Sequence, residues 1–336
     1  MTFCFPEQNE SFWMSGELAR RFSSLNGKKI GDIVVVGGGI SGLSIAFHLK
    51  SVHKNLSVIL IEKSFLGSGA SGRCGGIVVD HFSVYGSQED SKYLRSFLKT
   101  NGLECDLAIG EDHPHEYLLD PCKLIHGLVQ LCTEVGVEIF ENSPVRNFSN
   151  FSRLLVGDMF EVCFETAIFA SGNIAGLCSA EASIIQSSVQ NCIVVEASED
   201  IWQSWPWTYF EPSEGDADNY IWGRKLQNRR FLFGDYEIDE DNCAYSSIKA
   251  RNGILTLFRK HLGKDEDLKV VNGWSGPVHS YRSGFRRVMR IDGERNKLFV
   301  GGYGGHGIAA SVRSGEVITS FLNDGSYAED FPVVTY

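Results

Sequence analysis

The stretch Ile33-Val-Val-Val-Gly-Gly-Gly-Ile-Ser-Gly42 decides the fold. Its run of β-branched residues predicts a short buried strand, because such side chains favour the pleated surface of a sheet. The glycines that follow fit the pattern GxGxxG: Gly37 permits a tight turn, Gly39 lets backbone approach a pyrophosphate, and Gly42 lets a helix pack close to the strand. Residues 43–49 then show helical apolar spacing, so a strand, a turn and a helix are predicted in that order.

A second predicted strand, residues 56–61, ends at Glu62 and completes a unit of the size that dinucleotide binding needs. A carboxylate at this place accepts hydrogen bonds from ribose hydroxyls and would repel the 2′-phosphate of NADP. The alternative is a glycine-rich turn of some other α/β protein, which the combined pattern disfavours. The fingerprint alone does not choose between NAD and FAD.

The rest of the chain is predicted as mixed structure, with no internal repeat. Residues 1–30 are interpreted as a polar extension that packs on the outside, and residues 84–119 are polar with little periodicity. The predicted elements are a helix that begins at Asp120-Pro121, strands at 137–140 and 166–170, an antiparallel sheet within 183–275, a strand at 298–300, a glycine-rich loop at 301–307 and a helix at 308–322.

Composition excludes several classes of function. The 336 residues carry a net charge of −11, which disfavours general nucleic-acid binding because phosphate contacts need clustered Lys and Arg. No apolar run is long enough for a membrane span, and no signal peptide is recognised, so a cytoplasmic location is expected. The nine cysteines form no CxxC pair, and His113 and His115 lack partner ligands, so no metal site is predicted.

Further motifs follow one another in the order of a known family. The chain resembles the D-amino-acid-oxidase-like (DAO) superfamily of FAD-dependent oxidoreductases in Gly67–Gly76 (its GASGRNGG loop), Asp120–Leu124 (DPxxL), Ile168–Gly172 (vxAtG), Trp274-Ser-Gly276 (a WxG turn) and Leu298–Ile308 (its second flavin-contact stretch). Within the superfamily, Phe12-Trp13, the Gly72–Gly76 core and Gly302–Gly307 resemble the gamma-glutamylputrescine oxidase group, which oxidises primary or secondary amines.

The resemblance implies FAD as the cofactor. Glycines at 69, 72, 75 and 76 would let backbone pass close to a flat ring, and the glycines of 302–307, followed by a helix, would aim N–H groups at the pyrimidine edge of the flavin. The residues predicted to bind FAD are Gly37, Gly39, Ile40, Ser41, Gly42, Glu62, Lys63, Gly69, Ala70, Ser71, Arg73, Cys74, Gly75, Gly76, Val145, Ser171, Gly172, Gly302, Gly304, Gly305, His306, Gly307 and Ile308.

The chain departs from the family pattern at three places. Cys74 replaces the usual Asn, so a polar contact is weakened, and a covalent flavin link through its sulfur is a minor alternative. The stretch 77–119 is short where the family has a longer insertion, and Ser283–Met289 replaces another family motif. A trimmed substrate lobe is consistent with a large substrate, with a site completed by a partner, or with lost catalysis.

The flavin is expected to carry most of the chemistry, and the catalytic side chains are weaker predictions. His306 would tune the flavin or keep an amine neutral, with a structural loop histidine as the alternative. Tyr303 would wall the substrate site or belong to the core. Arg224 would bind a carboxylate with its planar fork or form a surface ion pair, and His81 would line the cleft.

The predicted fold is α/β, with a Rossmann-like FAD-binding lobe (1–80, 120–182 and 286–336) and a smaller antiparallel-sheet substrate lobe (81–119 and 183–285). The leading functional hypothesis is FAD-dependent oxidation of an amine or amino acid to an imine, with hydride passing to flavin N5 and then to oxygen or another acceptor. Two alternatives stay open: a tailoring oxidoreductase that acts on a larger or carrier-bound substrate, and a non-catalytic flavin-binding subunit. Association with a partner protein or as a homo-oligomer is also left open.

Overall fold

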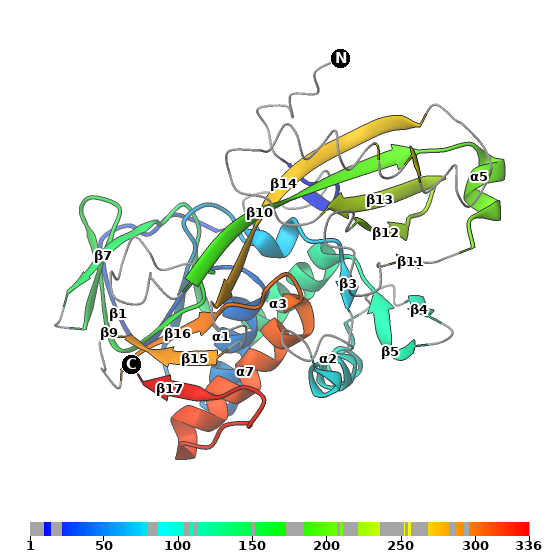
Figure 1. Cartoon of the computed structure of the whole chain (residues 1–336). Coiled ribbons are helices and arrows are strands. Elements are labelled where there is room, and N and C mark those ends of the chain that lie inside the picture. The colour runs from blue at the N-terminus through cyan, green and yellow to red at the C-terminus, as the bar shows by residue number, and fades with distance from the viewer. Residues whose placement is uncertain are drawn as a thin grey trace.

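The structure combines one large sheet flanked by helices with a second, antiparallel sheet, which confirms the predicted α/β fold (Figure 1). It is a computed structural model that describes residues 10–14, 22–78, 87–103, 108–110, 113–149, 152–172, 185–206, 209–210, 221–235, 252, 255–256, 268–281, 287–291 and 296–335.

The large sheet places the fingerprint strand at its centre. Parallel neighbours flank β1 on both sides, and the last residue of β1, Val36, pairs with Ile61 on one side and Phe169 on the other. The three strands therefore end at one edge, where parallel sheets bind their ligands. The strand order is β17 (Val333–Thr335), β15 (Arg287–Arg290), β16 (Lys297–Gly301), β9 (Phe160–Phe169), β1 (Lys28–Val36), β2 (Val58–Ile61) and β6 (Glu138–Phe140), with β7 (Val145–Ser149) and β8 (Arg153–Val156) joined to β9.

Both faces of this sheet are buried, as a largely parallel sheet requires. Ile33 and Val35 of β1 point to the helices, whereas Val34 and Val36 point to the β7–β8 hairpin side. The helices are α1 (Ile40–Val52), α2 (Gln88–Thr100), α3 (Pro121–Val135) and α7 (Gly307–Asp324), and the short helices are η1 (Phe12–Met14), η2 (Ala70–Gly72) and α5 (Glu199–Ser204).

Local sequence fixes where the helices begin and end. Asp120 caps α3 by accepting bonds from the N–H groups of Cys122 and Lys123, and Gly136 ends that helix in the left-handed region at φ 85°. Ser87 and Asp90 form a reciprocal capping box at the start of α2. These signals are local, so the start of α3 was predictable from sequence.

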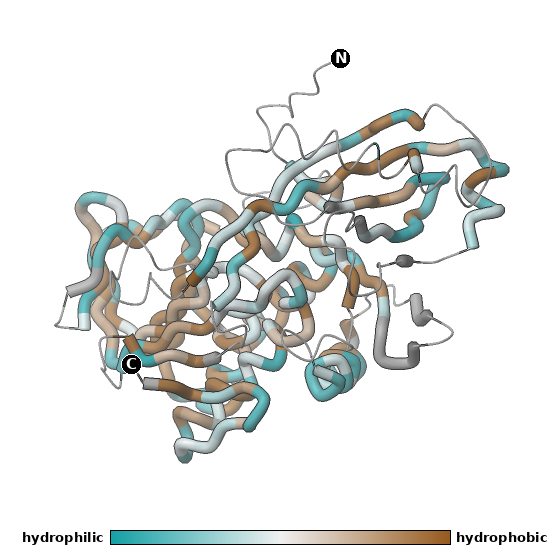
Figure 2. The backbone as a smooth tube through the Cα atoms, in the orientation of Figure 1, coloured by the Kyte–Doolittle hydropathy of each residue, from teal (hydrophilic) through white to brown (hydrophobic). Residues whose placement is uncertain are grey.

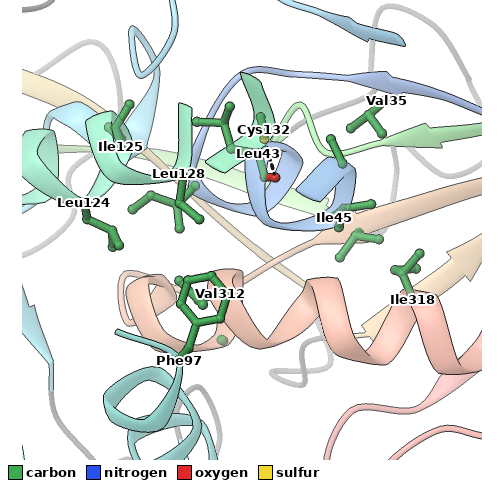
Figure 3. Packing of buried hydrophobic residues seen from close by; sticks show 14 of the residues in the cluster. Val35, Leu43, Ile45, Phe97, Leu124, Ile125, Leu128, Cys132, Val312 and Ile318 are labelled. Carbon is green, nitrogen blue, oxygen red and sulfur yellow. Dashed lines mark hydrogen bonds between the residues drawn. The ribbon is translucent and has the colours of Figure 1, made fainter. Parts of the chain in front are cut away.

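Helix α2 joins the core beside the fingerprint. Its Leu94 and Phe97 pack in the same hydrophobic cluster as α1, α3 and α7, where Phe97 faces Val312 (Figure 3). Residues 84–119 show little periodicity, and 81–119 are predicted to belong to the substrate lobe; α2 packs in the cluster of α1, α3 and α7, and the division into lobes stays a prediction. Most of the surface of α2 is polar, as its pale and teal tube shows (Figure 2), and this masks the narrow apolar stripe.

The antiparallel sheet is carried by two long strands. Its order is β11 (Tyr209–Phe210), β12 (Ile221–Lys225), β13 (Arg230–Asp235), β10 (Ile185–Glu196) and β14 (Lys269–Tyr281), and a separate small sheet contains β3 (Ile77–Val78), β5 (His113–Leu118) and β4 (Ala108–Gly110). One end of the β10–β14 ladder, at Ile185 and Tyr281, packs in the core of the large sheet. Farther along the ladder, Val194 and Trp274 pack in a core of the antiparallel sheet itself (Figure 1).

Two sequence interpretations need correction. Trp274-Ser-Gly276 is not a turn but lies inside β14, since the strand continues to Tyr281. The N-terminal extension does not simply pack on the outside: Ser11 is fully buried and Met14 is 7% exposed. Neither residue belongs to a periodic run, so no local pattern indicated that they are buried.

Candidate cofactor and active site

The fingerprint turn has the close backbone packing that the sequence predicted. Gly37 adopts φ +114°, and a Cβ on it would lie 2.5 Å from the carbonyl oxygen of Ala170 at the end of β9. A Cβ on Gly42 would collide with the carbonyl oxygen of Gly37, so only glycine allows α1 to approach the turn. These glycines bring the start of α1 to the edge where β1, β2 and β9 end.

The start of α1 is open to an anion. Gly39 is the N-cap and supplies no side-chain acceptor, so the first N–H groups of the helix depend on other partners. A Cβ on Gly39 would meet only the side chain of Ser71, whose Oγ accepts a bond from the Ile40 N–H at 3.0 Å. This glycine-lined helix N-terminus fits a pyrophosphate, because the helix dipole favours negative charge there.

Glu62 is held rigidly beside this turn. Its carboxylate is 7% exposed and accepts bonds from the Gly38 N–H at 2.7 Å, the Ser64 N–H at 2.9 Å and the Ser68 hydroxyl at 3.3 Å. A carboxylate has about four acceptor positions, so capacity is left for a ribose hydroxyl. Glu62 thus links the second strand to the fingerprint turn and remains suited to its predicted role.

The N-terminal segment grips the Gly72–Gly76 loop. The Ser11 hydroxyl donates to the carbonyl of Gly72, and the Trp13 indole N–H donates to the carbonyl of Cys74 at 2.8 Å. Both contacts join residues 61 positions apart. The resemblance singled out the Trp13 aromatic pair, but no sequence signal indicated that it contacts this loop.

Strand β14 grips the same loop from another side. The Trp274 indole N–H donates to the carbonyl of Arg73 at 2.8 Å. A Cβ on Gly276 would lie 2.8 Å from Cβ of Arg73, so the absence of a side chain at 276 makes room for Arg73. The Trp and the Gly of the WxG motif therefore both contact Arg73.

Arg224 is the third residue that holds the Gly72–Gly76 loop in place. Its Nη1 donates to the carbonyls of Gly75 at 3.2 Å, Gly76 at 2.9 Å and Leu119 at 2.8 Å, and its guanidinium lies 5.3 Å from the centre of the Trp13 ring. Burial lowers its pKa to about 10, so it is still charged at neutral pH. Nη1 therefore already binds backbone carbonyls. A bond to a substrate carboxylate stays a prediction, and it would have to come from the other nitrogens of the guanidinium.

The glycines of this loop mostly make room for protein. A Cβ on Gly72 would collide with Met14, one on Gly75 would lie 2.5 Å from the Trp222 ring, and one on Gly76 would crowd Leu119 and Arg224. Only Gly69 has open space around its Cβ position. At Gly72, Gly75 and Gly76 the missing side chain thus makes room for other parts of the protein, and contact of this loop with the cofactor ring stays a prediction.

Cys74 is poorly suited to covalent chemistry. Burial raises the pKa of its thiol to about 11, and Sγ donates to the carbonyl of Ser71 at 3.3 Å. At neutral pH it is therefore almost entirely protonated, and the thiolate is the reactive form of cysteine.

The second glycine-rich loop, residues 301–307, contacts strand β14. Gly302, Gly304 and Gly305 adopt φ of 73°, 56° and 85°, values that favour glycine. The Gly304 N–H donates to the carbonyl of His279 at 3.0 Å. His279 was missed by the sequence analysis because it belongs to no motif, yet its ring packs against the Cα of Gly172 and burial lowers its pKa.

His306 lines a small pocket at the start of α7. It is the N-cap of that helix, and its Nδ1 lies 3.2 Å from the carbonyl oxygen of Gly304. The His306 side chain does not cap the first turn of α7, and a role of the N–H groups of that turn at the flavin edge stays a prediction. The pocket is lined by Ile77, Val78, Ser87, Asp90, His306, Ile308 and Ala309.

The other predicted residues are dispersed around the same edge. The Tyr303 hydroxyl bonds to Ser41 at the start of α1, and a wall of the substrate site stays a prediction for this side chain. Lys63 and Ala70 are exposed, and Val145 begins β7 and packs against the hairpin-side core. Ser171 and Gly172 follow β9, while His81 lies outside the described residues. Within the described ranges, every helix is too short or too polar to span a lipid bilayer.

Comparison with known proteins decides the family. The model for "DAO: FAD dependent oxidoreductase" matches residues 32–110 and 110–321. The chain belongs to the DAO family. FAD is therefore the cofactor, and the glycine-lined start of α1 fits its pyrophosphate; that the fingerprint turn, Glu62 and the two glycine-rich loops hold it stays a prediction.

Relatives of this DAO-family chain include the probable oxidoreductase OrdL of Haemophilus influenzae, 22% identical over 401 residues that cover 96% of this chain and 90% of the relative. Gamma-glutamylputrescine oxidoreductase of Escherichia coli is 45% identical over 107 residues, which are 26% of this chain and 25% of that one. The OrdL alignment is longer than the 336 residues here, so that relative has segments that this chain lacks.

Solved structures of similar fold include glycine oxidase from Geobacillus kaustophilus, with a TM-score of 0.71 and 16% identity, covering 89% of this chain and 96% of that one. L-proline dehydrogenase from P. horikoshii has a TM-score of 0.72 and 17% identity, covering 90% and 95%. These DAO-like structures support the two-sheet architecture along almost the whole chain.

Proposed function

We propose that this FAD-dependent oxidoreductase oxidises the C–N bond of an amine or amino acid to an imine. The observation that carries the proposal is the arrangement at the start of α7, where a loop of left-handed glycines leads into a helix without a side-chain cap, beside a pocket that His306 lines. The similar proteins support this substrate class, because by their names they act on gamma-glutamylputrescine, glycine and L-proline.

When bound, FAD would accept a hydride at N5 from the carbon that bears the substrate nitrogen. The protein's part is electrostatic and steric. The uncapped start of α7 stabilises negative charge that develops next to it. Ile77, Val78 and Ile308 would give the pocket an apolar wall, and the His306 side chain would offer a hydrogen-bonding group to an amine.

The division into a FAD-binding lobe and a substrate lobe is part of this proposal. The antiparallel sheet of β10–β14 would form the substrate lobe, and α2 would belong to the FAD-binding lobe, because it packs in that core. The segments that OrdL has and this chain lacks favour a second candidate, in which a trimmed lobe admits a larger or carrier-bound substrate. A non-catalytic flavin-binding subunit is the third.

One measurement separates these candidates. The visible absorbance of purified protein is recorded before and after anaerobic addition of free amines and amino acids. Bleaching of the flavin by one of them supports the proposal and identifies the substrate type. A flavin that dithionite reduces but no free amine or amino acid reduces would overturn it, and reduction by a carrier-bound amine would support the second candidate.

The electron acceptor and the assembly are proposed only in outline. Oxygen or another acceptor would reoxidise the flavin, and stopped-flow mixing of the reduced protein with air-saturated buffer tests oxygen directly. The relative named sarcosine oxidase subunit beta, 36% identical over 73 residues, is a subunit by its name and supports association with a partner protein or a second copy. Light scattering of the purified chain measures whether it is monomeric.

A further inference from the structure

Three hydroxyl groups form a continuous chain between the second glycine-rich loop and the fingerprint turn. The Tyr303 hydroxyl lies 2.8 Å from Oγ of Ser41, and Oγ of Ser41 lies 2.9 Å from Oγ of Ser314. Ser314 in turn donates to the backbone carbonyl of Ser311 at 2.6 Å. The bond between Ser41 and Tyr303 joins residues that are 262 positions apart in the sequence. The three hydroxyls together link α1, α7 and the loop 302–307.

The carbonyl at one end fixes the direction of every bond. Each hydroxyl has a single hydrogen. Because Ser314 gives its hydrogen to the carbonyl of Ser311, it accepts from Ser41, and Ser41 must then accept from Tyr303. The Ser41 hydrogen is therefore engaged inside the protein, although Ser41 belongs to the turn that the sequence analysis assigned to the cofactor.

Tyr303 is held at both of its ends. Its backbone bridges to Ser280 of β14, and the neighbouring Gly304 N–H donates to the carbonyl of His279. A Cβ on Gly307 would lie 2.9 Å from Cβ of Tyr303, so the first residue of α7 packs against the same side chain. The phenol thus crosses from β14 to the start of α1 and fixes the loop between them.

We propose that Tyr303 is a positioning residue that sets the loop 302–307 through Ser41, and that the Ser41 hydroxyl donates to Ser314 and not to a phosphate of FAD. Ser41 then serves the cofactor through its backbone and through Tyr303. Loss of either hydroxyl frees the loop at the flavin edge, so it shifts the flavin reduction potential. The inference depends on the proposed contact of this loop with the flavin but not on the identity of the substrate.

The test compares Tyr303→Phe, Ser41→Ala and the double variant. The readouts are the dissociation constant of FAD, the flavin midpoint potential from dithionite titration, and the thermal midpoint of the apoprotein. None of them needs a substrate, so failure of the amine hypothesis is seen separately. Ser44→Ala is the matched control, because the Ser44 hydroxyl bridges α1 to the carbonyl of Val312 in α7 without contacting the loop.

We expect both single variants to lower the midpoint potential and to weaken FAD binding by about twofold to tenfold, the effect of one hydrogen bond. The double variant should match Ser41→Ala, since that substitution already removes the bond from Tyr303. Ser44→Ala should leave the potential unchanged. A Ser41→Ala variant that loses FAD while Tyr303→Phe retains it would show a phosphate contact and overturn the proposal, as would additive effects or an unchanged potential in both.

Discussion

The indole nitrogen of Trp13 lies 2.8 Å from the carbonyl oxygen of Cys74, which joins the N-terminal segment to the loop that follows the second strand. The buried hydroxyl of Ser11 and the side chain of Met14 contact the same loop at Gly72. The N-terminal segment therefore supports the loop that is predicted to contact FAD, and its contribution is measurable.

Replacing Trp13 with Phe keeps an aromatic ring but removes the bond to Cys74. We expect weaker FAD binding, by about twofold to tenfold for a single hydrogen bond, measured by flavin fluorescence on release. Trp202→Phe is the matched control. Its indole likewise donates to a backbone carbonyl, that of Leu226 at 2.9 Å, and faces a cation, Lys225, but it contacts a different core. Equal loss of FAD in both variants would contradict a specific role for Trp13.

Arg224→Lys tests whether the guanidinium supports the loop or binds substrate. Nη1 of Arg224 reaches all three backbone carbonyls while the planar guanidinium lies against the Trp13 ring, and a lysine ammonium lacks that planar group. Loop support predicts a fall in unfolding free energy of about 2 kcal/mol or more together with weaker FAD binding. A normal thermal midpoint with a raised KM confined to carboxylate-bearing substrates would instead show a substrate contact. Arg229→Lys, at an exposed ion pair with Glu196, is the control.

The buried ion pair between Arg313 and Asp90 is expected to matter far more than surface pairs. Arg313 also bonds to Asp330 at 2.6 Å, and Asp90 is 1% exposed. Arg313→Met leaves a buried carboxylate without its cation, which costs about 3–5 kcal/mol in urea unfolding. Arg153→Met breaks an exposed pair with Glu161 and should cost at most about 1 kcal/mol. Similar costs for both variants would refute this contrast.

His48 should make the fold sensitive to mild acid. Its ring stacks on Phe97, Nε2 lies 2.7 Å from the Tyr93 hydroxyl, and burial lowers its pKa below the ordinary value near 6.5. The unfolded chain then binds the proton more readily than the folded one, so stability is constant at high pH and falls as pH drops below about 6.5.

The check for His48 is urea unfolding between pH 8 and 5.5. His48→Gln should be less stable than the parent at pH 8, and its stability should fall less as the pH is lowered. Parallel curves for the two proteins would mean that His48 does not titrate differently in the folded state.

Cys74 is expected to leave the flavin unattached. Because burial raises the pKa of its thiol to about 11, little thiolate exists at neutral pH to form a carbon–sulfur bond. Precipitation of the yellow protein with trichloroacetic acid should release all the flavin into the supernatant, and Cys74→Ser should behave in the same way. Flavin that stays in the parent pellet but not in that of Cys74→Ser would prove the covalent link.

Local signals account for the parts of the fold that sequence could predict. Within the GxGxxG turn between β1 and α1, Gly42 packs against Gly37 five positions away, and Asp120 caps α3 two residues away. The grips on the Gly72–Gly76 loop by Trp13, Arg224 and Trp274 join segments that are 61 to 201 positions apart. Such contacts leave no periodicity, so the resemblance marked these residues without explaining them. Whether Arg224 and His306 take part in catalysis stays a prediction.

Strand β14 also fixes a length. Trp274 holds the first glycine-rich loop through Arg73, and His279 holds the second through Gly304. These residues are five positions apart in extended chain, a span of about 17 Å, so the two loops cannot approach or separate without bending the strand. Inserting one residue between Trp274 and His279 would turn the following side chains to the opposite face and misalign both loops. The cofactor site therefore has its dimensions set by a strand of the neighbouring sheet.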